Sequence, residues 1–212
     1  LGSAVTSLGT TMVIKIVSPK EVSGPGFYSH LLPDNRWLSG GASNLGGISF
    51  AQHRDEINLW NRKAAEHGPA TTVMYPLVGT GERFPISHKE LKKISTAIPE
   101  SDVDEFRATL EGIAFAERLA YETLAKAGAP LTGKLFTVGG GSRSALWNSI
   151  RATVLNRTIS IVDESGSDIG AAMIACAAHQ GGDLAKALDE FNSSTAEQVK
   201  PTDGEVKMYE DR

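Results

Sequence analysis

The chain has 212 residues, with 21 Lys plus Arg against 25 Asp plus Glu, so its formal net charge is −4. This balance argues against a dedicated nucleic-acid binder, which normally carries a basic stripe. No apolar run approaches the roughly 18 residues of a spanning helix, so we expect no membrane segment. The single cysteine, Cys176, excludes an internal disulfide and suits a reducing, cytoplasmic environment.

The N-terminal part of the chain predicts strands followed by one helix. β-branched residues favour strands, whereas Gly, Pro, Asn and Asp favour turns. In chain order we expect two strands within residues 4–17 that break at Gly9, a hairpin of residues 27–32 and 36–40 around Pro33-Asp34-Asn35, a glycine-rich turn at 40–47 that opens a helix through Glu66, and an extended connection over 68–89.

The helical pattern is strongest over residues 101–128. Apolar residues recur there at spacings of three and four, Ser101 supplies an N-cap, and Gly128 supplies a stop. After it, strands and helices alternate, which predicts βαβ units and at least part of a parallel sheet. The expected elements are a strand at 134–138, a turn at 139–141, a helix at 144–155, a strand at 158–162 and a helix at 167–179.

Residues 192–212 are polar and weakly patterned, and predict a short surface helix with a frayed tail. We therefore expect one α/β domain over residues 1–192, with 193–212 as its polar tail. Cys176 lies in an Ala-rich segment, which indicates buried packing and not a nucleophile. The five histidines show no zinc-binding spacing, so no metal site is predicted.

Three glycine clusters are candidates for phosphate binding. Gly9-Thr10-Thr11 forms a turn between strands, where the backbone and hydroxyls can approach an anion or simply close a hairpin. Gly46-Gly47 precedes an expected helix, whose N-terminus offers N–H groups to an anion unless it is only a tight turn. The third cluster is Gly139-Gly140-Gly141, followed by Ser142-Arg143-Ser144.

This third cluster also imitates a dinucleotide-binding fingerprint. It lies between a strand and a helix, and Asp163 ends the next expected strand. The last glycine of that fingerprint is replaced by Ser144, so the match is incomplete. A dinucleotide-dependent oxidoreductase is accordingly a minor alternative.

Six segments in this order resemble the C-terminal half of FGGY-family carbohydrate kinases of the xylulokinase and ribulokinase type. They are SLGTT (7–11), GGASNLGG (40–47), YPLVGTGERFP (75–85), RATLEGIAFAERLAYETL (107–124), GGGSRSALWNSIRATVLNRTI (139–159) and ESGSDIGAAMIA (164–175). The resemblance covers roughly residues 4–180 and implies a ribonuclease-H-like domain of the actin/Hsp70/hexokinase type, with a mixed sheet flanked by helices.

The resemblance also implies ATP and Mg²⁺ as cofactors and a set of nucleotide contacts. Gly9, Thr10 and Thr11 would meet the phosphates, and Gly46 and Gly47 would lie by the phosphate and ribose. Gly140 and Ser144 would flank the adenine, while Gly139 and Gly141 shape the backbone. Two positions depart from the family pattern: Ala51 replaces a polar residue, and Ile86-Ser87-His88 replaces an aspartate. Glu82 and Arg83 are expected to be structural.

The same resemblance places the general base, an aspartate, upstream of Leu1, together with most contacts to the sugar. We therefore expect no catalytic residue in this chain, and no kinase activity from it alone. The full protein would phosphorylate a pentulose or similar sugar. The alternative is a non-catalytic, actin-like interaction module. The oligomeric state stays open, a homodimer being one outcome.

Overall fold

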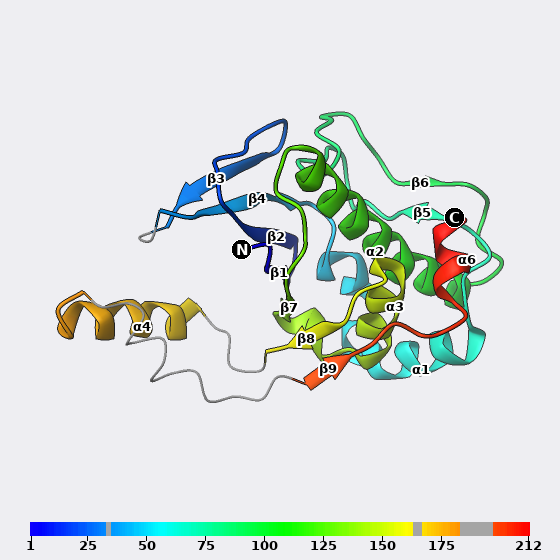
Figure 1. Ribbon diagram of the computed structural model, residues 1–212. Coiled ribbons are helices and arrows are strands. Elements are labelled where there is room, and N and C mark those ends of the chain that lie inside the picture. Colours follow the sequence, from blue (N-terminus) through cyan, green and yellow to red (C-terminus); the bar gives the residue numbers. More distant parts are fainter. Residues whose placement is uncertain (33–34, 163–166, 183–196) are drawn as a thin grey trace.

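The computed structural model describes residues 1–32, 35–162, 167–182 and 197–212 (Figure 1). Within these residues, a mixed sheet has the strand order β3-β4-β2-β1-β7-β8-β9, and β5 pairs with β6 in a separate ribbon. The strands are β1 Ala4–Leu8, β2 Met12–Ser18, β3 Phe27–Leu31, β4 Trp37–Ser43, β5 Met74–Tyr75, β6 Ile94–Ser95, β7 Leu135–Val138, β8 Ile159–Ile161 and β9 Glu197–Val199.

The direction of the strands changes across the sheet. β1, β2, β4 and β3 pair antiparallel, β1–β7 and β7–β8 pair parallel, and β8–β9 pair antiparallel. The predicted strands and the parallel part of the sheet are thus confirmed. β4 runs on through Ser43, so half of the stretch expected as a glycine-rich turn is in fact strand. Pro33 and Asp34, in the predicted hairpin turn, lie outside the described residues.

The helices gather on one side of the sheet, except α4, which stands apart from α1, α2 and α3 (Figure 1). They are the 3-10 helices η1 Gly47–Glu56 and η2 Gly140–Arg143, and the α-helices α1 Ile57–His67, α2 Asp102–Lys126, α3 Ala145–Leu155, α4 Ser167–His179 and α6 Val206–Glu210. None of the helices in the described ranges is both long and apolar enough to cross a membrane.

The predicted helix over residues 47–66 consists of two pieces. Its first ten residues wind as the 3-10 helix η1, and Glu56, with φ −120° and ψ 19°, interrupts the winding before α1. The start of η1 is tied by hydrogen bonds to the β1–β2 turn, which constrains how its first residues wind. The break sets the direction in which α1 leaves η1.

α2 begins and ends where its sequence signals predict. The Ser101 hydroxyl accepts a hydrogen bond from the Asp104 N–H (3.1 Å), as an N-cap does. Gly128 has φ +100°, a left-handed conformation that favours glycine, and the Ala129 N–H donates back to the Leu124 carbonyl (2.8 Å). Residues 106–114 of this 25-residue helix are buried on every side, between α1, α3 and β5, whereas the turns after Glu117 bury only one face.

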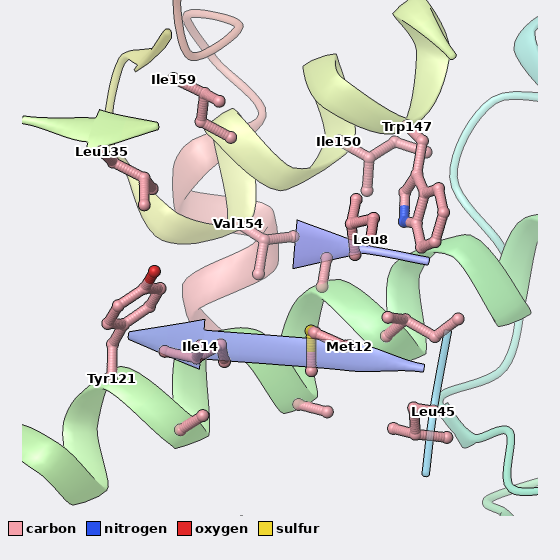
Figure 2. Packing of buried hydrophobic residues seen from close by; sticks show 14 of the residues in the cluster. Leu8, Met12, Ile14, Leu45, Tyr121, Leu135, Trp147, Ile150, Val154 and Ile159 are labelled. Atoms are coloured by element: carbon pink, nitrogen blue, oxygen red, sulfur yellow. The ribbon is translucent and has the colours of Figure 1, made fainter. Parts of the chain in front are cut away.

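The hydrophobic core lies between the β1–β2 hairpin and helices α2 and α3 (Figure 2). Side chains along β2 alternate between buried and half-buried, so one face of the strand points to the core. Leu8, Met12, Ile14, Tyr121, Trp147, Ile150 and Val154 come from these elements, and Leu45, Leu135 of β7 and Ile159 of β8 belong to the same cluster. This packing holds the β1–β2 turn and the start of α3 in fixed positions.

Two expectations about the C-terminal region are wrong. β9 joins the sheet beside β8, and Tyr209 on α6 is fully buried, so residues 197–212 do not form a frayed surface tail. Cys176 is half-exposed on α4, so it is not a buried packing residue. The expected division between residues 192 and 193 lies outside the described residues.

Candidate functional site

The β1–β2 turn and the start of η1 are joined by hydrogen bonds. The Gly47 N–H donates to the Gly9 carbonyl (2.8 Å) and the Ile48 N–H donates to the Thr10 carbonyl (3.0 Å). These two N–H groups at the helix start are therefore satisfied within the protein, and they do not form the anion site that the sequence suggested. A Cβ on Gly46 would lie 2.8 Å from the Thr10 carbonyl oxygen, so this glycine permits the close approach.

The glycines between β7 and α3 have different surroundings. Gly139 has φ +90°, and a Cβ there would lie 2.7 Å from the Leu8 carbonyl oxygen. A Cβ on Gly141 would lie 2.7 Å from the Trp147 ring, whereas a Cβ on Gly140 would meet no protein atom within 4 Å. Gly139 and Gly141 are thus explained by packing, and Gly140 faces open space.

A cavity of about 500 Å³ lies between these two regions. It is lined by Leu8, Gly9, Thr10, Gly47, Ile48, Phe50, Arg54, Ile57, Asn58, Asn61, Leu110, Gly140, Gly141, Arg143, Ser144 and Trp147. The structure therefore brings together residues from all three predicted glycine clusters. Of the predicted site residues, Thr11, Gly46 and Gly139 do not line the cavity; Gly46 and Gly139 instead let neighbouring backbone segments approach one another.

Sequence analysis missed the wall of the cavity that η1 and α1 provide. Arg54, Ile57, Asn58 and Asn61 all line it. The last three have the i, i+1, i+4 spacing of one helix face, which is a usable signal once the start of α1 is known. Ala51, the position that departs from the family pattern, is exposed and does not line the cavity.

The cavity is suited to a negatively charged ligand. Arg54 of η1 and Arg143 of η2 both line the cavity, and no acidic residue of the described chain is among the lining residues. Such an arrangement attracts anions. The Ser144 hydroxyl accepts a hydrogen bond from the Trp147 N–H (3.2 Å), so its own proton remains able to donate to a ligand.

Glu82 anchors the long connection between α1 and α2. Its buried carboxylate accepts hydrogen bonds from the Ser43 hydroxyl (2.8 Å), the Asn44 N–H (2.7 Å) and the Tyr75 hydroxyl (2.8 Å). Burial, together with the neighbouring Glu82 charge, raises the pKa of Tyr75 above its usual value. The structural role expected for Glu82 is confirmed, and Arg83 supports it by donating to the Asn44 side chain (2.7 Å).

The sheet and the cavity define the class of protein. A sheet that begins with an antiparallel hairpin differs from the parallel dinucleotide-binding sheet, so the glycines at 139–141 are not part of a Rossmann-type dinucleotide site. The chain instead has the mixed sheet flanked by helices of the actin- and hexokinase-like ATPase fold, as do the sugar kinases to which it is structurally similar.

The chain belongs to the FGGY family of carbohydrate kinases, because the model for the C-terminal domain of that family matches residues 4–179. Xylulose kinase from Staphylococcus xylosus is 25% identical over 232 aligned positions, which cover all of this chain and 48% of that protein. L-fuculokinase from Salmonella typhi is 42% identical over 69 residues, 32% of this chain and 15% of that protein.

Solved structures agree with the family match. A xylulose kinase from Brucella ovis superposes with a TM-score of 0.84 at 27% identity, over 99% of this chain and 45% of that one. Glycerol kinase from Plasmodium falciparum, solved with ADP, superposes with a TM-score of 0.77 at 18% identity and shows the shared fold, over 99% of this chain and 45% of that one. The chain therefore spans about half the length of these relatives.

Proposed function

We propose that this chain is the nucleotide-binding part of an ATP-dependent sugar kinase, which transfers the γ-phosphate of ATP to a hydroxyl of a pentulose or similar sugar. The observation that carries the proposal is the cavity at which all three glycine clusters meet. Its lining includes two arginines and no acidic residue from the described chain. The sugar class rests on the relatives named xylulose kinase.

The proposed nucleotide lies with its phosphates at the β1–β2 turn. Gly9 and Thr10 present exposed backbone and a hydroxyl there, and Arg54 and Arg143 offset the phosphate charge. Gly140, whose missing side chain leaves open space, admits the flatter part of the nucleotide near Ser144. Apolar residues such as Leu110 and Trp147 complete the cavity wall.

Mg²⁺ enters the proposal only as the companion of the ATP phosphates. In the described residues, no group of three His, Cys, Asp or Glu side chains is placed to hold a metal ion. Mg²⁺ commonly binds substrate phosphates and water with one or two carboxylates. We propose that the general base and most sugar contacts come from outside this domain, as the resemblance to the family implies.

Titration of the ¹⁵N-labelled chain with ADP tests the proposal. We expect saturable shifts of the amide resonances of Gly9, Thr10, Gly47 and residues 139–144, with weak affinity because the chain spans only about half the length of the kinases it resembles. Resonances of residues on α4 should not move. If no resonance shifts at millimolar ADP, nucleotide binding is excluded for the chain and the actin-like interaction module becomes the better interpretation.

A further inference from the structure

The second wall of the cavity contains an asparagine that the protein leaves unsatisfied. Asn61 lies one turn into α1, on the face that also carries Ile57 and Asn58, and all three line the cavity. Its side-chain oxygen Oδ1 is buried and accepts no hydrogen bond from any residue in the described part of the chain. Buried polar atoms of native proteins are nearly always hydrogen-bonded, so an unpaired one indicates a partner that the protein itself does not supply.

Asn148, a buried asparagine on α3, provides the contrast. Its Nδ2 donates to the Ser142 carbonyl (2.6 Å), and its Oδ1 accepts from Nη1 of Arg151 (3.2 Å). The fold therefore pairs both ends of the amide of Asn148. At the cavity wall it leaves the oxygen of Asn61 without a partner.

The position of Asn61 along the cavity indicates which part of a nucleotide it meets. The phosphate end is set by Gly9 and Thr10, whose carbonyls hold the start of η1. Asn61 comes after the whole of η1 and the first turn of α1, so along the chain it is the lining residue of this wall that is furthest from the β1–β2 turn. In the orientation proposed above, the part of the nucleotide furthest from that turn is the base.

An asparagine amide is chemically matched to adenine. It offers an acceptor and a donor side by side, and adenine presents the 6-amino group beside a ring nitrogen. A half-turn about the last side-chain bond of Asn61 exchanges its oxygen and nitrogen, so either atom can face the cavity.

We infer that the side-chain amide of Asn61 binds the edge of the adenine base and accepts a hydrogen bond from its 6-amino group. The inference rests on the proposed nucleotide-binding function and deepens it. It makes Asn61 a residue that determines which nucleotide the domain prefers.

The test compares two nucleotides on two forms of the chain. The nucleotides are ADP and purine riboside 5′-diphosphate, which lacks only the 6-amino group. For the wild-type chain we expect ADP to bind about tenfold more tightly, the size of one good hydrogen bond. In Asn61→Leu, ADP affinity should fall by about tenfold and the preference should disappear, because the amide and the amine act as one pair.

Stability and a control variant separate this role from a structural one. Leu has a similar shape and removes the unpaired oxygen, so Asn61→Leu should melt no lower than the wild type. Arg62→Ala changes the next residue of α1, which is exposed and does not line the cavity, and should keep both affinities. If ADP binds but Asn61→Leu retains the preference, the inference on Asn61 is overturned while nucleotide binding stands. If neither nucleotide binds the wild-type chain, both are overturned.

Discussion

Arg151 on α3 forms a two-pronged ion pair with Glu117 on α2, with Nε 2.7 Å from Oε2 and Nη2 2.8 Å from Oε1. Both side chains are fully buried. Two threonines of the sheet complete the cluster: Thr6 of β1 donates to Glu117 (2.6 Å), and Thr137 of β7 accepts from Arg151 (2.9 Å). The pair thus joins both helices to the two parallel strands that support the glycine turns.

Removing one partner of this pair should strongly destabilise the domain. Arg151→Met leaves a buried carboxylate without its cation, and we expect the free energy of unfolding to fall by about 3–5 kcal/mol. Adding Glu117→Gln to that variant should recover part of the loss, because no unpaired buried charge remains. Urea unfolding measures both. Glu122→Gln removes an exposed pair with Arg118 (3.9 Å) and should cost under about 0.5 kcal/mol. Equal losses in the exposed and buried variants would contradict this account.

Gly140→Ala separates ligand binding from folding. The new methyl group meets no protein atom within 4 Å, so the free energy of unfolding should change by less than about 1 kcal/mol. The methyl group points into the proposed nucleotide site, and we expect ADP affinity to fall by about tenfold or more, from steric overlap. Gly170→Ala on α4 also has open space, does not line the cavity, and is the control. Unchanged ADP affinity in Gly140→Ala would place the nucleotide elsewhere.

The buried carboxyl group of Asp104 should make the free energy of unfolding of the domain depend on pH. Burial alone would raise the pKa of its carboxyl group, but hydrogen bonds from the Thr71 hydroxyl (2.6 Å), the Thr71 N–H (2.8 Å) and the Glu100 N–H (3.0 Å) outweigh burial and lower it below 3.8. The unfolded chain therefore binds the proton first as the pH falls. The stabilisation from Asp104 is fully present above pH 3.8 and is lost as the pH falls through the lower, folded-state pKa.

Asp104→Asn removes this titration. The variant should be less stable than the wild type at pH 7 by about 1–3 kcal/mol, because an amide cannot accept all three hydrogen bonds. Urea unfolding from pH 7 down to pH 3 should show the difference between wild type and variant shrinking below pH 3.8. Asp102→Asn, an exposed change in the same turn, is the control. A difference that stays constant down to pH 3 would count against the assigned role of the Asp104 carboxylate.

The sequence predicted those elements whose signals are local. The periodic apolar face of α2, with Ser101 and Gly128 at its ends, and the alternating residues of β2 depend only on neighbours along the chain. The prediction of a frayed tail was wrong because the contacts that order residues 197–212 come from distant parts of the chain. Tyr209 is buried by groups about 100 residues away in sequence, including Arg107. The pattern of apolar and polar residues within 197–212 does not indicate these distant contacts.

The candidate site was predicted in part for the same reason. Glycines such as Gly47 and Gly140 mark places where backbone approaches backbone or ligand, and residues from each glycine cluster do line the cavity. Asn61 was missed because its direction depends on the break at Glu56, between η1 and α1. The start of η1 is in turn held by hydrogen bonds to the β1–β2 turn, which lies about 40 residues earlier in the chain. Local sequence patterns do not report such a contact.

Tyr209→Phe tests whether the buried hydroxyl of Tyr209 on α6 contributes to the stability of the domain. The Tyr209 hydroxyl accepts from Nη2 of Arg107 (2.9 Å) and donates to Oε1 of Glu111 (2.9 Å), so it completes a buried ion pair on α2. Burial and the Glu111 charge raise its pKa further above the usual value of about 10, at which the phenol is already neutral near pH 7. Removing the hydroxyl should lower the free energy of unfolding by about 1–3 kcal/mol, measured in urea, because both partners lose a bond in a buried site. Tyr28→Phe, at a side chain that is 55% exposed, should change it by under about 0.5 kcal/mol. If the two variants were equally stable, the Tyr209 hydroxyl would contribute little to the stability of the domain, and α6 would be held by the packing of the Tyr209 ring near Phe115.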